Sequence, residues 1–102
     1  RAVLEYIRQN YEKPLTLEMA AKHIFLSPYY LSHAFKKEFD ITFVEYLTRV
    51  RVDRAKSLLT ETDLSIIEVA AQVGYEDSGY FSKVFKKTVG MSPAQYRKLD
   101  PI

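Results

Sequence analysis

The sequence contains the same short motif twice, fifty residues apart. Residues 31–37 read LSHAFKK and residues 81–87 read FSKVFKK, while the apolar positions just upstream match better at an offset of 49. The second copy therefore carries one extra residue, near Glu76 and Asp77. Two copies are fewer than the three or so repeats that a solenoid needs to bury a continuous core. The duplication predicts a pair of equivalent modules.

Apolar residues recur at helical spacing along nearly the whole chain, and no segment alternates as a strand would. The prediction is an all-α fold of about seven helices, separated by residues that cap or break helices. Ser27 followed by Pro28 predicts a helix start, Ser65 with Glu68 predicts a capping box, and Gly74 and Gly90 predict helix ends. The expected helices cover residues 2–11, 16–24, 28–39, 42–59, 65–74, 78–89 and 92–96.

A short helix followed by a turn and a longer helix is the pattern of a helix-turn-helix unit. The small side chains of Ala20, Ala21, Ala70 and Ala71 would let the paired helices approach closely. We expect one unit at about residues 1–41, a linker helix at 42–59 and a second unit at about 60–100. The linker would be about 27 Å long, so two recognition helices could enter successive major grooves, which recur about every 34 Å.

Composition narrows the class of protein without deciding it. The chain has no cysteine, so a disulfide framework and a thiolate metal site are excluded, and a reducing, cytoplasmic setting is expected. No apolar run approaches the roughly 18 residues of a membrane span, so we expect no membrane partner. The net charge is only +2, a mild preference for anionic partners. Because the chain begins at Arg1, inside an amphipathic pattern, we expect a piece of a longer protein.

The sequence offers nothing that indicates an enzyme. His23 and His33 are the only histidines, and no metal-binding, phosphate-binding or paired-carboxylate motif accompanies them. We therefore expect no catalytic residue, no metal and no cofactor. The rival to a DNA-binding role is a helical protein-interaction module. The basic FKK that ends both motifs argues against that rival, since protein contacts would not require the same basic cluster twice.

Nearly the full chain resembles the DNA-binding domain of AraC/XylS-family transcription regulators. The resemblance is carried by LSPYYLSHAFKKEF, FVEYLTRVRVDRAKSLL and SIIEVAAQVGYEDSGYFSKVFKKTVGMSPAQYRK, about seventy residues together. It implies two helix-turn-helix units, a bacterial origin, promoter DNA and RNA polymerase as partners, and an effector or receiver domain elsewhere in the protein. The strings FVEYLTRVR and DSGYFSKVFKK are most similar to output domains of YesN-type response regulators.

The chain departs from the family pattern at two positions. Phe25 stands where the first unit usually has a turn glycine, so we expect the turn to be either strained or reshaped, because a side chain penalises positive φ. Asp40 replaces the usual helix-ending glycine, a milder change since Asp tolerates the left-handed region. We expect the first unit to dock on DNA less well than the second.

Helical phase and the resemblance together select the residues that would face DNA bases. We expect Ser32 to bind a base or a phosphate, and His33 to donate a hydrogen bond to a guanine acceptor. Tyr29 is expected to contact a sugar or a thymine methyl group, and Lys83 to donate to O6 and N7 of guanine. The full expected set is Pro28, Tyr29, Ser32, His33, Ser78, Gly79, Ser82 and Lys83.

The remaining cations are assigned to the DNA backbone or to the fold. Phosphate contacts are expected for Lys36, Lys37, Lys86, Lys87 and Arg49. Arg51 is open between a phosphate and an internal ion pair, and the resemblance favours the structural role. The repeated tyrosines are expected to pack in the core rather than bind a ligand, and they are Tyr30, Tyr46, Tyr80 and Tyr96.

Overall fold

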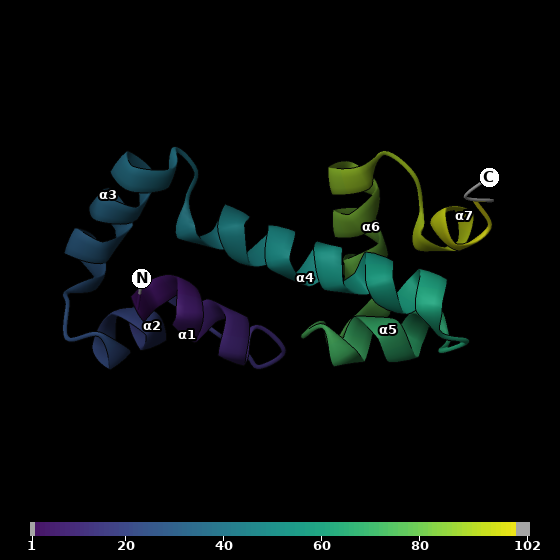
Figure 1. Ribbon diagram of the computed structural model, residues 1–102, viewed down its shortest axis with the longest axis horizontal. Coiled ribbons are helices and arrows are strands. Elements are labelled where there is room, and N and C mark those ends of the chain that lie inside the picture. The colour runs from purple at the N-terminus through teal and green to yellow at the C-terminus, as the bar shows by residue number, and fades with distance from the viewer. Residues whose placement is uncertain (1, 100–102) are drawn as a thin grey trace. The chain divides into compact units, whose positions relative to one another are not determined.

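Seven α-helices, and no strand, make up the part of the chain that the computed structural model describes, residues 2–99 (Figure 1). This confirms the predicted all-α fold. The helices are α1 (Ala2–Asn10), α2 (Leu17–His23), α3 (Pro28–Phe39), α4 (Phe43–Glu61), α5 (Ile66–Gln72), α6 (Ser78–Val89) and α7 (Pro93–Arg97).

The chain divides into two compact units, and the boundary lies inside α4 between Val50 and Arg51. The first half of α4 contributes Phe43 and Leu47 to the core of the first unit. Val52, Ala55 and Leu59 belong to the second half and are buried there. The segment expected as a separate linker is thus shared between the two units, and each half of the helix has its own packing partners.

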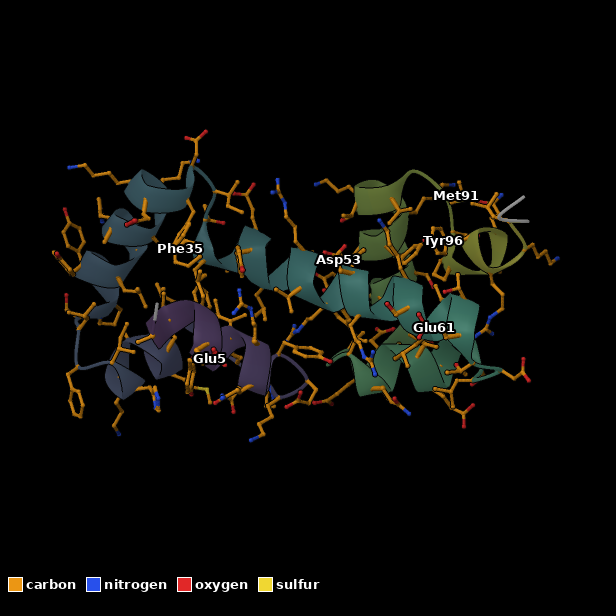
Figure 2. All side chains as sticks on the ribbon, viewed as in Figure 1. Glu5, Phe35, Asp53, Glu61, Met91 and Tyr96 are labelled. Carbon is orange, nitrogen blue, oxygen red and sulfur yellow. The ribbon has the colours of Figure 1, made fainter. Side chains whose placement is uncertain are left out.

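The core of the first unit is built where α1, α2, α3 and the start of α4 meet. Its buried side chains are Val3, Ile7, Leu15, Ala20, Ala21, Leu31, Phe35, Phe43 and Leu47. Phe35 lies between α3 and the beginning of α4 (Figure 2), and its ring meets Phe43 edge-on at a centroid distance of 5.9 Å. Packing of this apolar surface stabilises the unit at about 25 cal/mol per Å² removed from water.

The second unit repeats this arrangement with α5, α6, α7 and the end of α4. Phe81 and Phe85 occupy the places of Leu31 and Phe35, and both are fully buried. Tyr96 packs edge-on against Phe85 at 5.6 Å, as Tyr46 does against Phe35 at 5.7 Å. The internal repeat of the sequence therefore corresponds to a repeat of the core.

Local capping explains where most helices begin. The Ser27 hydroxyl accepts from Tyr30 N, and Ser65 with Glu68 forms the predicted capping box. The sequence contained two further boxes that were not predicted. Thr42 exchanges hydrogen bonds with Glu45 at the start of α4, and Ser92 does so with Gln95 at the start of α7.

The predicted end of α4 was two residues early. The helical pattern continues through the bond from Thr62 N to Leu58 O. The Arg97 guanidinium contacts this end of the helix, donating from Nε to Leu59 O at 2.9 Å and from a terminal nitrogen to Thr62 O at 3.4 Å. A cation is favourable at a helix C-terminus, where unpaired carbonyls carry partial negative charge.

Two predictions about packing were wrong. Tyr30 and Tyr80 are each 59% exposed, because they lie about 100° around the helix from the buried Leu31 and Phe81. Ala71 is exposed as well. At the offset of 49, the buried pair Ala20 and Ala21 corresponds to Val69 and Ala70, so only Ala70 of the second alanine pair lies at the contact between helices.

Candidate nucleic-acid interface

Each unit presents one longer helix behind a tight turn, with α2 packed on α3 and α5 packed on α6. Four residues, 24–27, separate the first pair and five, 73–77, separate the second, so the extra residue is in the turn as predicted. Both turns contain the same backbone hydrogen bond, from an N–H to the carbonyl oxygen five residues earlier. Leu26 N donates to Ala21 O, and Tyr75 N donates to Ala70 O.

The turn of the first unit has an unusual residue at its tightest point. Phe25 has φ +60° where the equivalent Gly74 has φ +103°. Phe25 is 94% exposed, so its side chain gains little from packing that could offset the unfavourable backbone. Phe25 thus keeps the positive φ of a turn glycine, a conformation that a side chain penalises, and Asp40 likewise adopts the left-handed region at φ +63°, as Gly90 does at +97°.

The predicted base-facing residues of α3 share one exposed face. Pro28, Tyr29, Ser32 and His33 are all exposed, and none contributes to the core. A helix with one buried face and such an exposed polar face can offer hydrogen-bonding groups to a major groove.

Two residues of that face, Tyr29 and His33, contact each other. The His33 Nδ1 atom lies 2.9 Å from Tyr29 O, one turn back along α3. The two rings pack at a centroid distance of 4.1 Å with an interplanar angle of 38°. The imidazole is therefore held by a hydrogen bond and by a ring contact.

The corresponding face of α6 is smaller and partly covered. Gly79 and Lys83 are exposed, whereas Ser78 and Ser82 are half-buried. Asp77 caps this helix by accepting from Gly79 N and Tyr80 N at 2.8 and 3.1 Å. A Cβ on Gly79 would lie 3.2 Å from that carboxylate oxygen, so a larger residue there would require a small shift of the Asp77 side chain.

The predicted phosphate-binding cations are all exposed, and they are Lys36, Lys37, Lys86, Lys87 and Arg49. Lys36 also has a structural contact, since its ammonium donates to Asp40 O at 3.4 Å at the end of α3. The pKa of Glu45 is lowered chiefly by hydrogen bonds from the backbone and side chain of Thr42, with smaller contributions from the positive charges of Lys36 and Arg49.

Arg51 has a structural role in the second unit. Its guanidinium carbon lies 5.2 Å from the centre of the Tyr75 ring, a cation–π contact. The side chain is only partly exposed.

The sequence prediction missed Asp77 and Arg97, two residues that fix the ends of helices. Asp77 directly precedes Ser78, so a cap was readable from the residue type alone. Arg97 contacts the carbonyl of Leu59, 38 residues away, and no local pattern predicts such a bond.

Residues 2–99 contain neither a metal-binding cluster nor a membrane-spanning helix. Within that range there is no group of three or more His, Cys, Asp or Glu side chains placed to hold a metal ion. The same described residues contain no helix with the length and hydrophobicity required to cross a membrane.

A family model described as "Helix-turn-helix domain" matches residues 20–99. Among characterised and uncharacterised relatives, the chain is 43% identical over 97 residues to the uncharacterized HTH-type transcriptional regulator YijO of Escherichia coli, covering 95% of this chain and 34% of that protein. It is 38% identical over 98 residues to the melibiose operon regulatory protein of the same species, covering 96% and 32%. The chain thus spans about a third of the length of these relatives.

Solved structures show the same fold. The C-terminal domain of the two-component response regulator yesN from Fusobacterium nucleatum has a TM-score of 0.92 and 41% identity, covering 94% of each chain. The C-terminal domain of AraT, a response regulator from Geobacillus stearothermophilus, has a TM-score of 0.94 and 42% identity, covering 98% of this chain and 84% of that one. The DNA-binding domain of AdpA, solved with a target DNA, has a TM-score of 0.88 and 25% identity, covering 93% and 86%. The chain belongs to the AraC family of helix-turn-helix DNA-binding domains.

Proposed function

We propose that this chain places a bacterial transcription regulator on promoter DNA by inserting α3 and α6 into two successive major grooves. The observation that carries the proposal is the repeated presentation of a capped helix whose inner face is buried and whose outer face is polar. Family membership supports DNA as the ligand. Because α4 is continuous from Phe43 to Glu61, it would set the separation of the two recognition helices.

Within this proposal, the exposed faces of α3 and α6 supply base contacts and the lysines behind them supply phosphate contacts. Lys83 is suited to guanine, whose O6 and N7 both accept hydrogen bonds in the major groove. Lys37 and Lys87 occupy equivalent positions in the two units and have long, exposed side chains suited to phosphates. Gly79 and the half-buried Ser78 and Ser82 would give the second helix fewer base contacts than the first.

We also propose that the full-length protein carries a signal-receiving domain, acts in the cytoplasm, and influences transcription through RNA polymerase. The relatives are about three times as long as this chain, which leaves room for such a domain. The likeness to C-terminal domains of two response regulators favours a receiver domain as the missing part.

The test compares a base-reading lysine with phosphate-binding lysines in the same chain. Lys83→Ala should weaken binding to the selected site by about 1 to 3 kcal/mol and relax the preference at one or two base pairs. Lys37→Ala and Lys87→Ala should instead weaken binding to all sequences about equally, and each should lower the salt slope by about one unit. Selected-site binding and salt titrations of labelled duplexes measure both quantities.

Five phosphate contacts predict that log K falls with log salt with a slope of about −4 to −5. A chain that binds no duplex even at low salt would contradict the proposal and favour a protein-interaction module. A change of base preference in the Lys37 and Lys87 variants, but not in Lys83→Ala, would show that the groove face has been assigned to the wrong side of the helix.

A further inference from the structure

The hydrogen bond between His33 and Tyr29 determines which nitrogen of the imidazole carries the proton. The partner of Nδ1 is a backbone carbonyl oxygen, which can only accept a hydrogen bond, so Nδ1 must donate at the observed 2.9 Å. A neutral imidazole has one N–H group, and placing it on Nδ1 leaves Nε2 as an acceptor. The opposite tautomer would place two lone pairs against each other.

The position of the ring is constrained as well as its tautomer. Tyr29 and His33 are one helical turn apart, and their rings are in contact at 4.1 Å on the exposed face of α3. Within residues 2–99, no hydrogen-bond partner of Nε2 is found, and the side chain is exposed. Nε2 is therefore available to a ligand that approaches this face.

We propose that His33 accepts a hydrogen bond from an exocyclic amine, adenine N6 or cytosine N4, on the strand that α3 contacts. This inference rests on the proposed insertion of α3 into a major groove, where these two amines are the donors that bases present. It differs from the sequence-based expectation that His33 donates to guanine, which would need an N–H on Nε2 as well and so a ring that carries a proton on both nitrogens.

The second unit offers the opposite chemistry at the equivalent position. Lys83 aligns with His33, and Gly79 stands where the first unit has Tyr29. An ammonium group can only donate, so it selects the acceptors O6 and N7 of guanine. The two half-sites should therefore differ, with an amine-bearing base required by the first unit and a guanine by the second.

The first experiment examines the protein without DNA. Nitrogen NMR of the 102-residue chain, at mildly alkaline pH where free histidine is neutral, distinguishes a protonated from an unprotonated ring nitrogen. We expect the His33 proton on Nδ1, with Tyr29→Phe behaving as wild type because the backbone acceptor and the ring are retained. A proton on Nε2 would overturn the inference without affecting the proposed DNA binding.

The second experiment removes single groups from the DNA. Selected-site binding by wild type and His33→Ala identifies the base pair whose preference depends on His33. Purine in place of adenine, or 2-pyrimidinone in place of cytosine, then deletes only the amine. We expect wild-type affinity to fall about threefold to tenfold, the range of one net hydrogen bond, and His33→Ala to be unaffected by the deletion.

Two results of this experiment would overturn the proposal. One is a loss of wild-type affinity caused by 7-deazaguanine, which lacks the N7 acceptor, but not by deletion of the amine. The other is a chain that selects a site with preferences unchanged in His33→Ala. A chain that selects no sequence at all would contradict the proposed function itself, and the NMR result would remain a separate measurement.

Discussion

Phe25 illustrates how one residue can oppose the local structure that surrounds it. The position requires positive φ, and a bulky side chain there costs about 1 to 2 kcal/mol relative to glycine. The exposed ring recovers little of that cost by burial, since 94% of its surface remains accessible. Asp40 has a similar φ, but its short polar side chain tolerates the left-handed region better. We therefore expect Phe25 to destabilise the first unit at a position where the second unit has Gly74.

Replacing Phe25 by glycine should stabilise the chain by about 1 kcal/mol, because relief of backbone strain exceeds the added freedom of the unfolded chain. Urea denaturation followed by circular dichroism measures the change. Gly74→Ala is the matched control at the equivalent turn, where φ is +103°, and it should destabilise by about the same amount. A loss of stability in Phe25→Gly would show that the exposed ring makes a stabilising contact.

Reciprocal capping boxes lie at the starts of α4, α5 and α7. The boxes of α4 and α5 contain a glutamate, whose carboxylate can be protonated. The pKa of Glu68 is lowered by hydrogen bonds from the backbone and side chain of Ser65, and the pKa of Glu45 is lowered chiefly by the equivalent bonds from Thr42. The box of α7 uses Gln95, which has the same shape and no charge to lose. One chain therefore contains titrating and non-titrating versions of the same motif.

Acid should weaken the starts of α4 and α5. A carboxylate whose pKa is lower in the folded state stabilises the fold above its unfolded pKa of about 4.3, and that contribution is lost as the pH falls through the folded value. Glu68→Gln keeps the box but removes this titration. We therefore expect stability to fall less between pH 7 and pH 3 in Glu68→Gln than in wild type, by denaturation at each pH. Equal pH dependence in the two proteins would contradict this role of Glu68.

At the scale of the whole molecule, α4 is one helix with two sets of packing partners. Leu47 is buried in the first unit, whereas Arg51 contacts Tyr75 and Ala55 is buried in the second. Because the boundary between units lies at residues 50 and 51, a change there alters the relation of the units without removing the core of either.

Inserting one alanine between Val50 and Arg51 should rotate one recognition helix relative to the other by about 100°. If both helices must enter grooves of the same duplex face, affinity for the full site should fall toward that of a single half-site. Circular dichroism and thermal unfolding should show intact helices, and binding at low salt should persist through the phosphate contacts. Undiminished affinity for the full site would argue that the two units bind DNA independently.

Sequence alone determined the features that depend on neighbours along the chain. The starts of α3 and α5 follow from Ser27 and Ser65 with residues three positions on, and the buried stripes follow from helical spacing. The repeat predicted two modules and the place of the extra residue, and helical phase with the family motifs selected the residues of α3 that the structure leaves exposed, and Gly79 and Lys83 of α6. These are short-range effects of hydrogen bonding and amphipathicity, so residue type and spacing are enough to predict them.

Only the tertiary structure decided the features that depend on orientation or on distant contacts. Arg97 binds carbonyls at the end of α4 that are more than thirty residues away, and a pairing at that separation has no local signature. Tyr30 and Tyr80 share the repeat with core residues, yet they lie beside the buried face of their helices, and the packing leaves them exposed. The contact between His33 Nδ1 and Tyr29 O could not be predicted from the sequence either. It depends on the rotamer that brings Nδ1 to a carbonyl oxygen, and residue type alone does not specify a rotamer.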